Sequence, residues 1–159
     1  MSWLGGRSRA TGELVTADNW NITHVNNPKW EHDQKYAGCF LTKTGTQATG
    51  LATAITWEAE SYDPDGMHST STNPSRITII RTGYYMVGIY ATANDVTSFY
   101  LARNGSLLWT FDGTHTAMSR VFYYIFTAGQ YVELYANTAS RTIGADTTIA
   151  FSPDYDGGI

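Results

Sequence analysis

The chain has 159 residues and a net charge of −4, and 42% of its residues are hydrophobic while only 15% are charged. An acidic chain with few charges lacks the basic surface of a nucleic-acid-binding protein, and no apolar run has the length of a membrane span, so neither nucleic acid nor membrane is an expected partner. Cys39 is the only cysteine, which excludes an intrachain disulfide and a cysteine-based zinc site, and we expect a small buried thiol.

Residues 1–35 are expected to form an attachment region separate from the main domain. Residues 1–13 are rich in Gly, Ser and Arg and lack the apolar core of a signal peptide, which predicts an extended arm on a protein that folds in a cytoplasm. A short helix is expected to begin at the N-cap Thr16 and to end before Pro28. The expected attachment residues come from the arm and from the apolar stripe of this helix: Arg7, Arg9, Trp20, Ile22 and Val25.

Residues 36–159 alternate short apolar runs with turn signals, which predicts an all-β domain of nine or ten strands in a sandwich. Ile55 and Trp57 are expected to point inward, and Asn104-Gly105 predicts a tight type I′ hairpin. In chain order, strands are expected at 37–42, 53–59, 75–80, 84–93, 98–103, 106–111, 119–126, 131–136 and 147–153. The stretches 44–50, 61–74, 112–116 and 137–146 are expected to be turns or loops.

Two of these strands, 84–93 and 119–126, are apolar on both faces. A strand of this kind must be covered on both faces. The protein's own core covers one face, and the sequence contains no amphipathic helix long enough to cover the other. We therefore predict that another copy of the chain covers it. The residues expected at this subunit interface are Tyr84, Met86, Tyr90, Val121, Tyr123 and Ile125.

No motif for catalysis or for metal binding is complete in this sequence. Asp63-Pro64-Asp65-Gly66 could supply half of a calcium loop, but the distal ligands are missing and turn chemistry explains the same residues. Glu58 and Glu60 share one strand face, as the carboxylates of a hydrolase acting on cell-wall sugars could, although a solvated pair is the simpler interpretation. We expect no enzymatic activity, no cofactor and no metal.

The abundant aromatic residues allow a second interpretation, in which exposed rings stack on sugars. Most tyrosines fall within the expected strands, which favours the core and the subunit interface instead. The residues nearest to expected loops, Tyr62, Trp109 and Tyr155, are the candidates for contact with a ligand.

The order of expected strands and short motifs over residues 36–153 resembles that of known protein families. The signals are, in order, a strand at Ala54–Glu58, a strand at Arg76–Ile80, Gly83-Tyr84-Tyr85, Arg103-Asn104-Gly105, and Ala128 to Leu134. This order resembles the jelly roll of the tumour-necrosis-factor and complement-globular-head families, with Gln130 in place of the usual Asp of their "G-D-x-V-x-L" strand. The resemblance implies a trimer that packs through the sheet holding the two doubly apolar strands.

A second resemblance concerns two shorter segments. Residues 11–21, TGELVTADNWN, resemble the "G-E-x-V-T-A-x-D-x-N" opening of many tailed-phage structural proteins, and residues 55–79 are similar to phage virion domains of the jelly-roll type. This likeness implies a trimeric decoration or cement protein on the capsid surface, bound to the major capsid protein or another virion protein after folding in the host cytoplasm. The absence of a stalk-forming repeat favours the capsid over a tail fibre. The alternative is a receptor- or glycan-binding module of a tail tip or fibre.

Overall fold

The computed structural model describes residues 38–154, apart from the side chains of residues 97, 113–115 and 154. The expected arm, the expected helix and Tyr155 lie outside the described residues, as do the five attachment residues Arg7, Arg9, Trp20, Ile22 and Val25. Within the described range there is no helix with the length and apolar character needed to cross a membrane.

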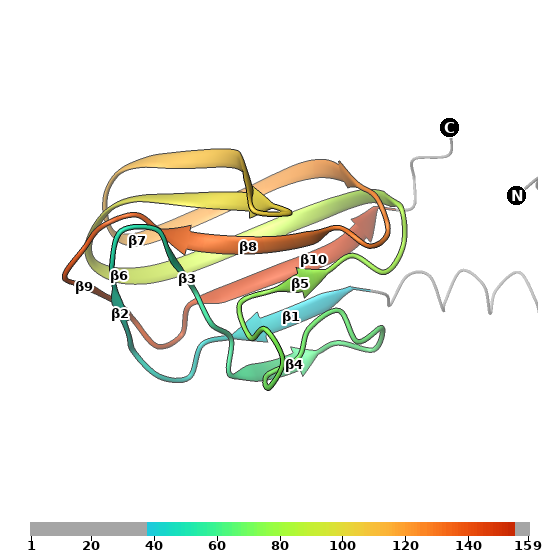
Figure 1. Ribbon diagram of the computed structural model, residues 1–159, viewed down its shortest axis with the longest axis horizontal. Coiled ribbons are helices and arrows are strands. Elements are labelled where there is room, and N and C mark those ends of the chain that lie inside the picture. Colours follow the sequence, from blue (N-terminus) through green and yellow to red (C-terminus); the bar gives the residue numbers. More distant parts are fainter. Residues whose placement is uncertain (1–37, 155–159) are drawn as a thin grey trace, which may run out of the picture. The chain divides into compact units, whose positions relative to one another are not determined.

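The described chain forms ten strands and no helix (Figure 1), which confirms the predicted all-β class. The strands are β1 (Cys39–Thr42), β2 (Gln47–Thr49), β3 (Thr53–Ala54), β4 (Ala59–Tyr62), β5 (Ile77–Thr78), β6 (Gly83–Arg103), β7 (Ser106–Phe126), β8 (Tyr131–Ala136), β9 (Arg141–Ile143) and β10 (Thr148–Asp154). Every strand pair is antiparallel, and Asn104-Gly105 connects β6 to β7 with positive φ at both residues, as a type I′ hairpin requires.

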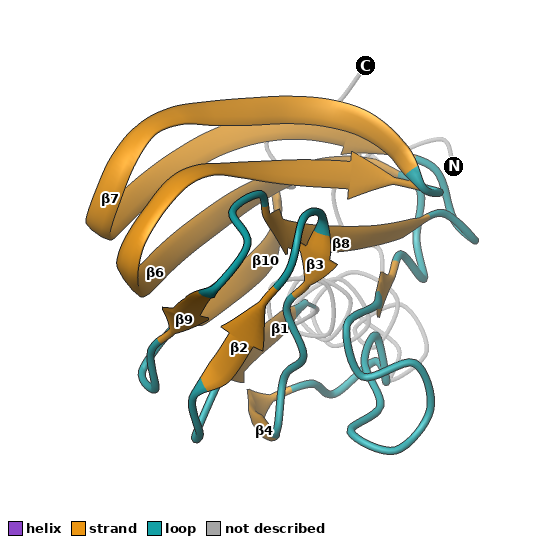
Figure 2. Ribbon diagram, turned by 60° about the vertical axis from the view of Figure 1, so that its left-hand side comes forward, coloured by secondary structure: helices purple, strands orange, loops and turns teal. Residues whose placement is uncertain are grey.

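The strands form the two layers of a sandwich, and β6 and β7 belong to both layers. In the first layer the order is β4-β1-β10-β6-β7, where β6 contributes residues 84–90 and β7 contributes residues 119–125. In the second layer, residues 99–103 of β6 pair with β8, which also pairs with β3 and β5. Figure 2 shows β6 and β7 curving together from one layer to the other.

The length of β6 and β7 differs from the prediction, which broke each of them into two strands and placed a loop at 112–116. Both strands run for 21 residues because β-bulges around Val96 absorb the bend while the two strands stay paired. Asp95, with φ of 53°, lies at this bend. The expected loops 44–50 and 137–146 also contain the short strands β2 and β9, and residues 53–59 form only β3 before β4 begins at Ala59.

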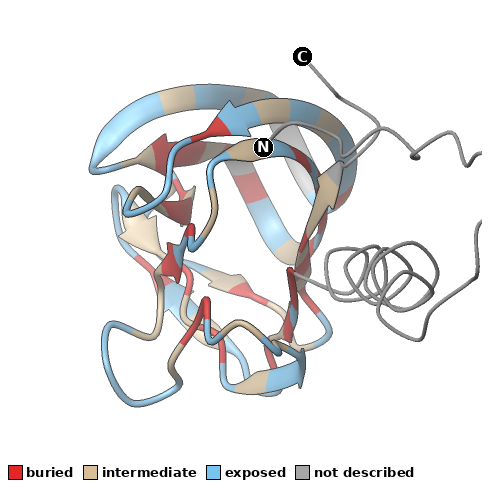
Figure 3. Cartoon of the chain, turned by 90° about the vertical axis from the view of Figure 1, so that its right-hand side faces the viewer, coloured by how far each residue is buried: buried red, intermediate tan, exposed pale blue. Residues whose placement is uncertain are grey.

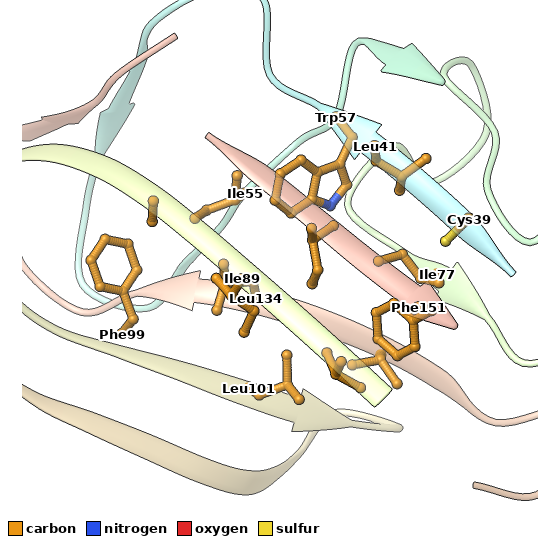
Figure 4. Close-up of a cluster of buried hydrophobic side chains, with 14 of the residues drawn as sticks. Cys39, Leu41, Ile55, Trp57, Ile77, Ile89, Phe99, Leu101, Leu134 and Phe151 are labelled. Atoms are coloured by element: carbon orange, nitrogen blue, oxygen red, sulfur yellow. The ribbon is translucent and has the colours of Figure 1, made fainter. Parts of the chain in front are cut away.

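The core lies between the two layers (Figure 4). Ile55 and Trp57 are completely buried, as predicted, and so are Val132 and Leu134 from the inward face of β8. Cys39 is buried in this cluster, and burial raises the pKa of its thiol, with a further contribution from the nearby Asp63 carboxylate. The predicted inward faces are therefore the observed ones.

Candidate functional site

The outward face of the first layer carries a band of exposed aromatic and aliphatic side chains. Inward and outward residues alternate along β6 and β7 (Figure 3), because successive side chains of a strand point to opposite faces. In β6, Tyr85, Val87 and Ile89 are buried. The outward residues form what we call the aromatic face, which consists of the six predicted interface residues Tyr84, Met86, Tyr90, Val121, Tyr123 and Ile125.

Strand pairing brings these six side chains together. Tyr84 lies opposite Ile125, and Met86 lies opposite Tyr123, whose hydroxyl is 3.6 Å from the Met86 sulfur. The exposed fractions of the six side chains range from 37% to 64%. With roughly 200 Å² for a fully exposed large side chain, the aromatic face presents roughly 600 Å² of apolar surface, the upper end of what single-copy soluble proteins expose.

The apolar surface continues across β10 to β1 and β4. Ala150 of β10 lies between Gly88 of β6 and Phe40 of β1, and Phe40 is 40% exposed. Tyr62 of β4 lies opposite Phe40, which places it beside the aromatic face. Thr148 and Ala150 of β10 and Phe40 of β1 are uncharged, so the surface between Gly88 and Phe40 is free of charged side chains.

Trp109, the other residue predicted to contact a ligand, lies at the opposite edge of the sandwich. It belongs to β7, which pairs only with β6, and its ring packs on Phe122 at 4.9 Å and on Tyr124 at 5.8 Å between ring centroids. Trp109 therefore closes the edge of the core although 41% of it is exposed. Tyr62 and Trp109 lie at different edges of the sandwich, and the expectation that either of them contacts a ligand stays a prediction.

Glu58 and Glu60 are both exposed, as the interpretation of a solvated pair expects, and each carboxylate also has a partner of its own. Glu58 accepts hydrogen bonds from the almost fully buried ammonium group of Lys43 and from the backbone N–H of Thr44. Burial alone would raise the pKa of Glu58, but these hydrogen bonds outweigh it and lower the pKa. Glu60 binds His68, with 2.8 Å between Oε1 and Nδ1.

Asp63 is used to hold a turn. Its carboxylate accepts hydrogen bonds from the backbone N–H groups of Met67 at 2.8 Å and His68 at 2.9 Å, and Gly66 has φ of 64°. Asp65 forms an ion pair with Arg81 at 3.1 Å. These contacts support the turn interpretation of residues 63–66, and among the described residues no three His, Cys, Asp or Glu side chains are grouped as metal ligands.

The outward face of the second layer carries a polar cluster around Glu133 that the sequence did not predict. Glu133 of β8 is 5% exposed and accepts hydrogen bonds from the hydroxyls of Ser75 at 2.7 Å and Tyr135 at 2.9 Å, with Arg76 Nε at 3.4 Å. Burial and the contact with Glu133 raise the pKa of Tyr135 to about 12. The alternation in 131–136 predicts that Glu133 points outward, but Ser75 is too distant in sequence to be recognised as its partner.

Comparisons with known proteins support the fold. No family model and no curated protein matches the sequence. Among solved structures, murine APRIL at pH 8.5 matches with a TM-score of 0.58 and 11% identity, over 74% of this chain and 98% of that one. The globular domain of the zebrafish complement 1qA protein matches with a TM-score of 0.59 and 12% identity, over 75% and 98%. Rabbit GITRL matches with a TM-score of 0.52 and 15% identity, over 73% and 93%.

The chain has the jelly-roll fold of these proteins. This confirms the fold predicted from the signals that resemble the tumour-necrosis-factor and complement-globular-head families. At these identities the likeness concerns the fold alone. The likeness of residues 11–21 and 55–79 to tailed-phage proteins stays a prediction.

Proposed function

We propose that the protein is a non-enzymatic structural protein of a tailed-phage virion, a homotrimer that decorates or cements the capsid surface. The aromatic face is the observation that carries the self-assembly part of this proposal. The placement on a virion is supported by the sequence likeness of residues 11–21 and 55–79 to phage structural proteins.

Self-assembly is the simplest use of the aromatic face. Standard protein interfaces bury about 800 Å² on each partner and have an apolar centre that is depleted in charged residues. The aromatic face, extended by Phe40 and Tyr62, approaches this area and consists of uncharged side chains. Trimer formation is also what the fold likeness to trimeric families favours.

The arrangement of the strands suits attachment at one end of the domain. Cys39 at the start of β1 pairs with Phe151 near the end of β10, and Tyr84 at the start of β6 pairs with Asp154 (Figure 1). The chain therefore enters the sandwich at the end where β10 finishes. The bend of β6 and β7 lies at the other end of the sandwich.

Two measurements test the proposal. Light scattering of the purified chain should give the mass of three copies, and a single-copy mass would refute the assembly. Immunogold labelling of phage particles that carry the protein should mark the capsid. Labels on the tail would contradict the decoration role, and unlabelled particles would contradict the virion role.

A further test concerns attachment through the N-terminal region. The full chain, added to particles that lack it, should bind, whereas a chain without residues 1–30 should stay folded and remain in solution. Binding of the truncated chain would show that the β domain, and not the N-terminal region, contacts the shell.

A further inference from the structure

The second layer borders a pocket that neither the aromatic face nor the proposed virion role uses. The pocket has a volume of about 280 Å³ and lies between the loop that follows the Asp63 turn, strand β5 and the start of β8. Its lining includes Met67, His68, Asn73, Arg76, Thr78 and Tyr131. No residue of the aromatic face lines it.

The walls of this pocket are fixed by hydrogen bonds. Asp63 holds the N–H groups of Met67 and His68, and the carbonyl of Met67 accepts from the N–H of Thr78 at 2.6 Å. The buried ring of His68 is held between Glu60 and the carbonyl oxygen of Pro74, which is 3.0 Å from Nε2. A pocket held in this way is formed before a ligand arrives and loses little freedom on binding.

The charges around the pocket are paired. Arg76 contacts Glu133, Arg81 contacts Asp65, and His68 contacts Glu60. None of the residues that line the pocket is a carboxylate. Each of these charges is already balanced by its partner, so the surroundings favour a ligand that carries no net charge.

Several lining groups have unused hydrogen-bonding capacity. The hydroxyls of Thr72 and Thr78, the side-chain amide of Asn73, and Nη1 and Nη2 of Arg76 form no hydrogen bond with any other described residue. Arg76 is nevertheless positioned, because its guanidinium lies 4.2 Å above the centre of the Tyr131 ring and Nε faces Glu133. Hydroxyls, an amide and a fixed guanidinium together donate to and accept from a compound with many hydroxyl groups.

We propose that this pocket binds one ring of a neutral saccharide. A volume of about 280 Å³ is close to the lower limit of about 300 Å³ for small-molecule sites, which suits a single ring rather than an extended chain. Thr78 and Asn73 hydrogen-bond to ring hydroxyls, and Arg76 donates through its terminal nitrogens. Neither Tyr62 nor Trp109, the candidates for ligand contact from the sequence, lines this pocket.

The test is a titration of the full chain, followed by the NMR shifts of its backbone amides, with the methyl glycosides of glucose, galactose, mannose and N-acetylglucosamine. Methyl glucuronide and methyl galacturonide serve as charged probes. Each differs from the methyl glycoside of glucose or galactose only by a carboxylate in place of the hydroxymethyl group. At least one neutral glycoside should shift the amides of residues 66–78 and 129–131, with a dissociation constant of about 1 mM. Shifts by the uronic acids alone, or by no glycoside, would overturn the proposal.

Two matched pairs of variants locate the binding. Thr78→Val removes a lining hydroxyl without changing the shape of the side chain and should weaken binding about fivefold, whereas Thr110→Val on β7 should not. Arg76→Lys keeps the charge beside Glu133 but lacks the planar fork and should weaken binding about tenfold, whereas Arg141→Lys on β9 should not. Equal affinity in all four variants would place the sugar elsewhere. None of the four changes the aromatic face, so failure of this proposal leaves the assembly test unaffected.

Discussion

Tyr123→Asp separates assembly from folding, because Tyr123 is 58% exposed in the single chain. If a neighbouring copy covers this exposed part, roughly 120 Å² of the side chain leaves water, which contributes about 3 kcal/mol per copy at roughly 25 cal/mol per Å². An aspartate at the same place adds the cost of burying a charge, which is several kcal/mol. The assembled state should therefore be lost.

The folded single chain should tolerate the same change. Tyr123 contributes little to the core, and its loss removes the cross-strand contact with Met86, which is worth about 1 kcal/mol or less. We expect light scattering to show single copies of Tyr123→Asp, and circular dichroism to show a melting transition of a folded β protein. Tyr90→Asp, on the neighbouring strand, should act in the same way.

Leu107→Asp is the matched control, because Leu107 also belongs to β7 and is 65% exposed, but lies in the second layer. This variant should keep the wild-type mass. Assembly through the aromatic face is refuted if Tyr123→Asp and Tyr90→Asp both keep the wild-type mass, or if Leu107→Asp dissociates as they do.

Three further predictions concern stability and reactivity. Lys43→Met should destabilise the fold by about 0.5–1 kcal/mol in urea, because it leaves Glu58 without its ammonium partner, while water screens part of this loss at a side chain that is 39% exposed. The lowered pKa of Glu58 stabilises the fold at pH values above the ordinary carboxyl pKa. This contribution is lost as the pH falls through the pKa that Glu58 has in the folded protein. The free energy of unfolding should therefore fall less steeply on acidification in Lys43→Met than in the wild type. Glu133→Gln should lower the pKa of Tyr135 from about 12, which an absorbance titration at alkaline pH measures. The raised pKa stabilises the fold at pH values below the ordinary tyrosine pKa, and this contribution is lost as the pH rises toward 12. Cys39 should react with a thiol reagent at the rate of unfolding, and a fast reaction in native buffer would contradict its burial.

The aromatic face could be predicted from the sequence because it depends on local alternation. Tyr84 and Tyr85 point to opposite faces whatever strand lies beside them, so a run that is apolar at both positions predicts one face in the core and a second apolar face turned outward. The same rule placed Val132 and Leu134 in the core correctly. These predictions required the strands to exist but did not require knowledge of their order in the sheet.

The bend of the long hairpin and the pocket could not be predicted in this way. Asn94-Asp95 has the composition of a turn, and only the pairing of β6 with β7 on both sides of it shows that the strand continues. The contact of Ser75 with Glu133 spans 58 residues of sequence and depends on β5 lying beside β8. Side-chain partners of this kind follow from topology, which the pattern of a single segment does not contain.

The two surfaces are independent in space, and this has a consequence for binding. The pocket residues Arg76 and Thr78 lie on the side of β8, and the aromatic face lies on the outward side of the first layer, so a neighbour that covers Tyr123 leaves the pocket open. In the proposed homotrimer, three linked copies that engage one surface together would gain about 10²–10⁴ in affinity over a single site.

Tyr123→Asp should therefore weaken binding to a surface that carries many saccharides, because it separates the copies. The same variant should bind a free methyl glycoside as the wild type does, because the lining of the pocket is unchanged. Surface plasmon resonance on a glycan-coated chip and NMR titration in solution measure the two quantities separately. A parallel loss in both would mean that the pocket depends on a neighbouring copy, and an unchanged affinity for the chip would mean that the copies bind independently.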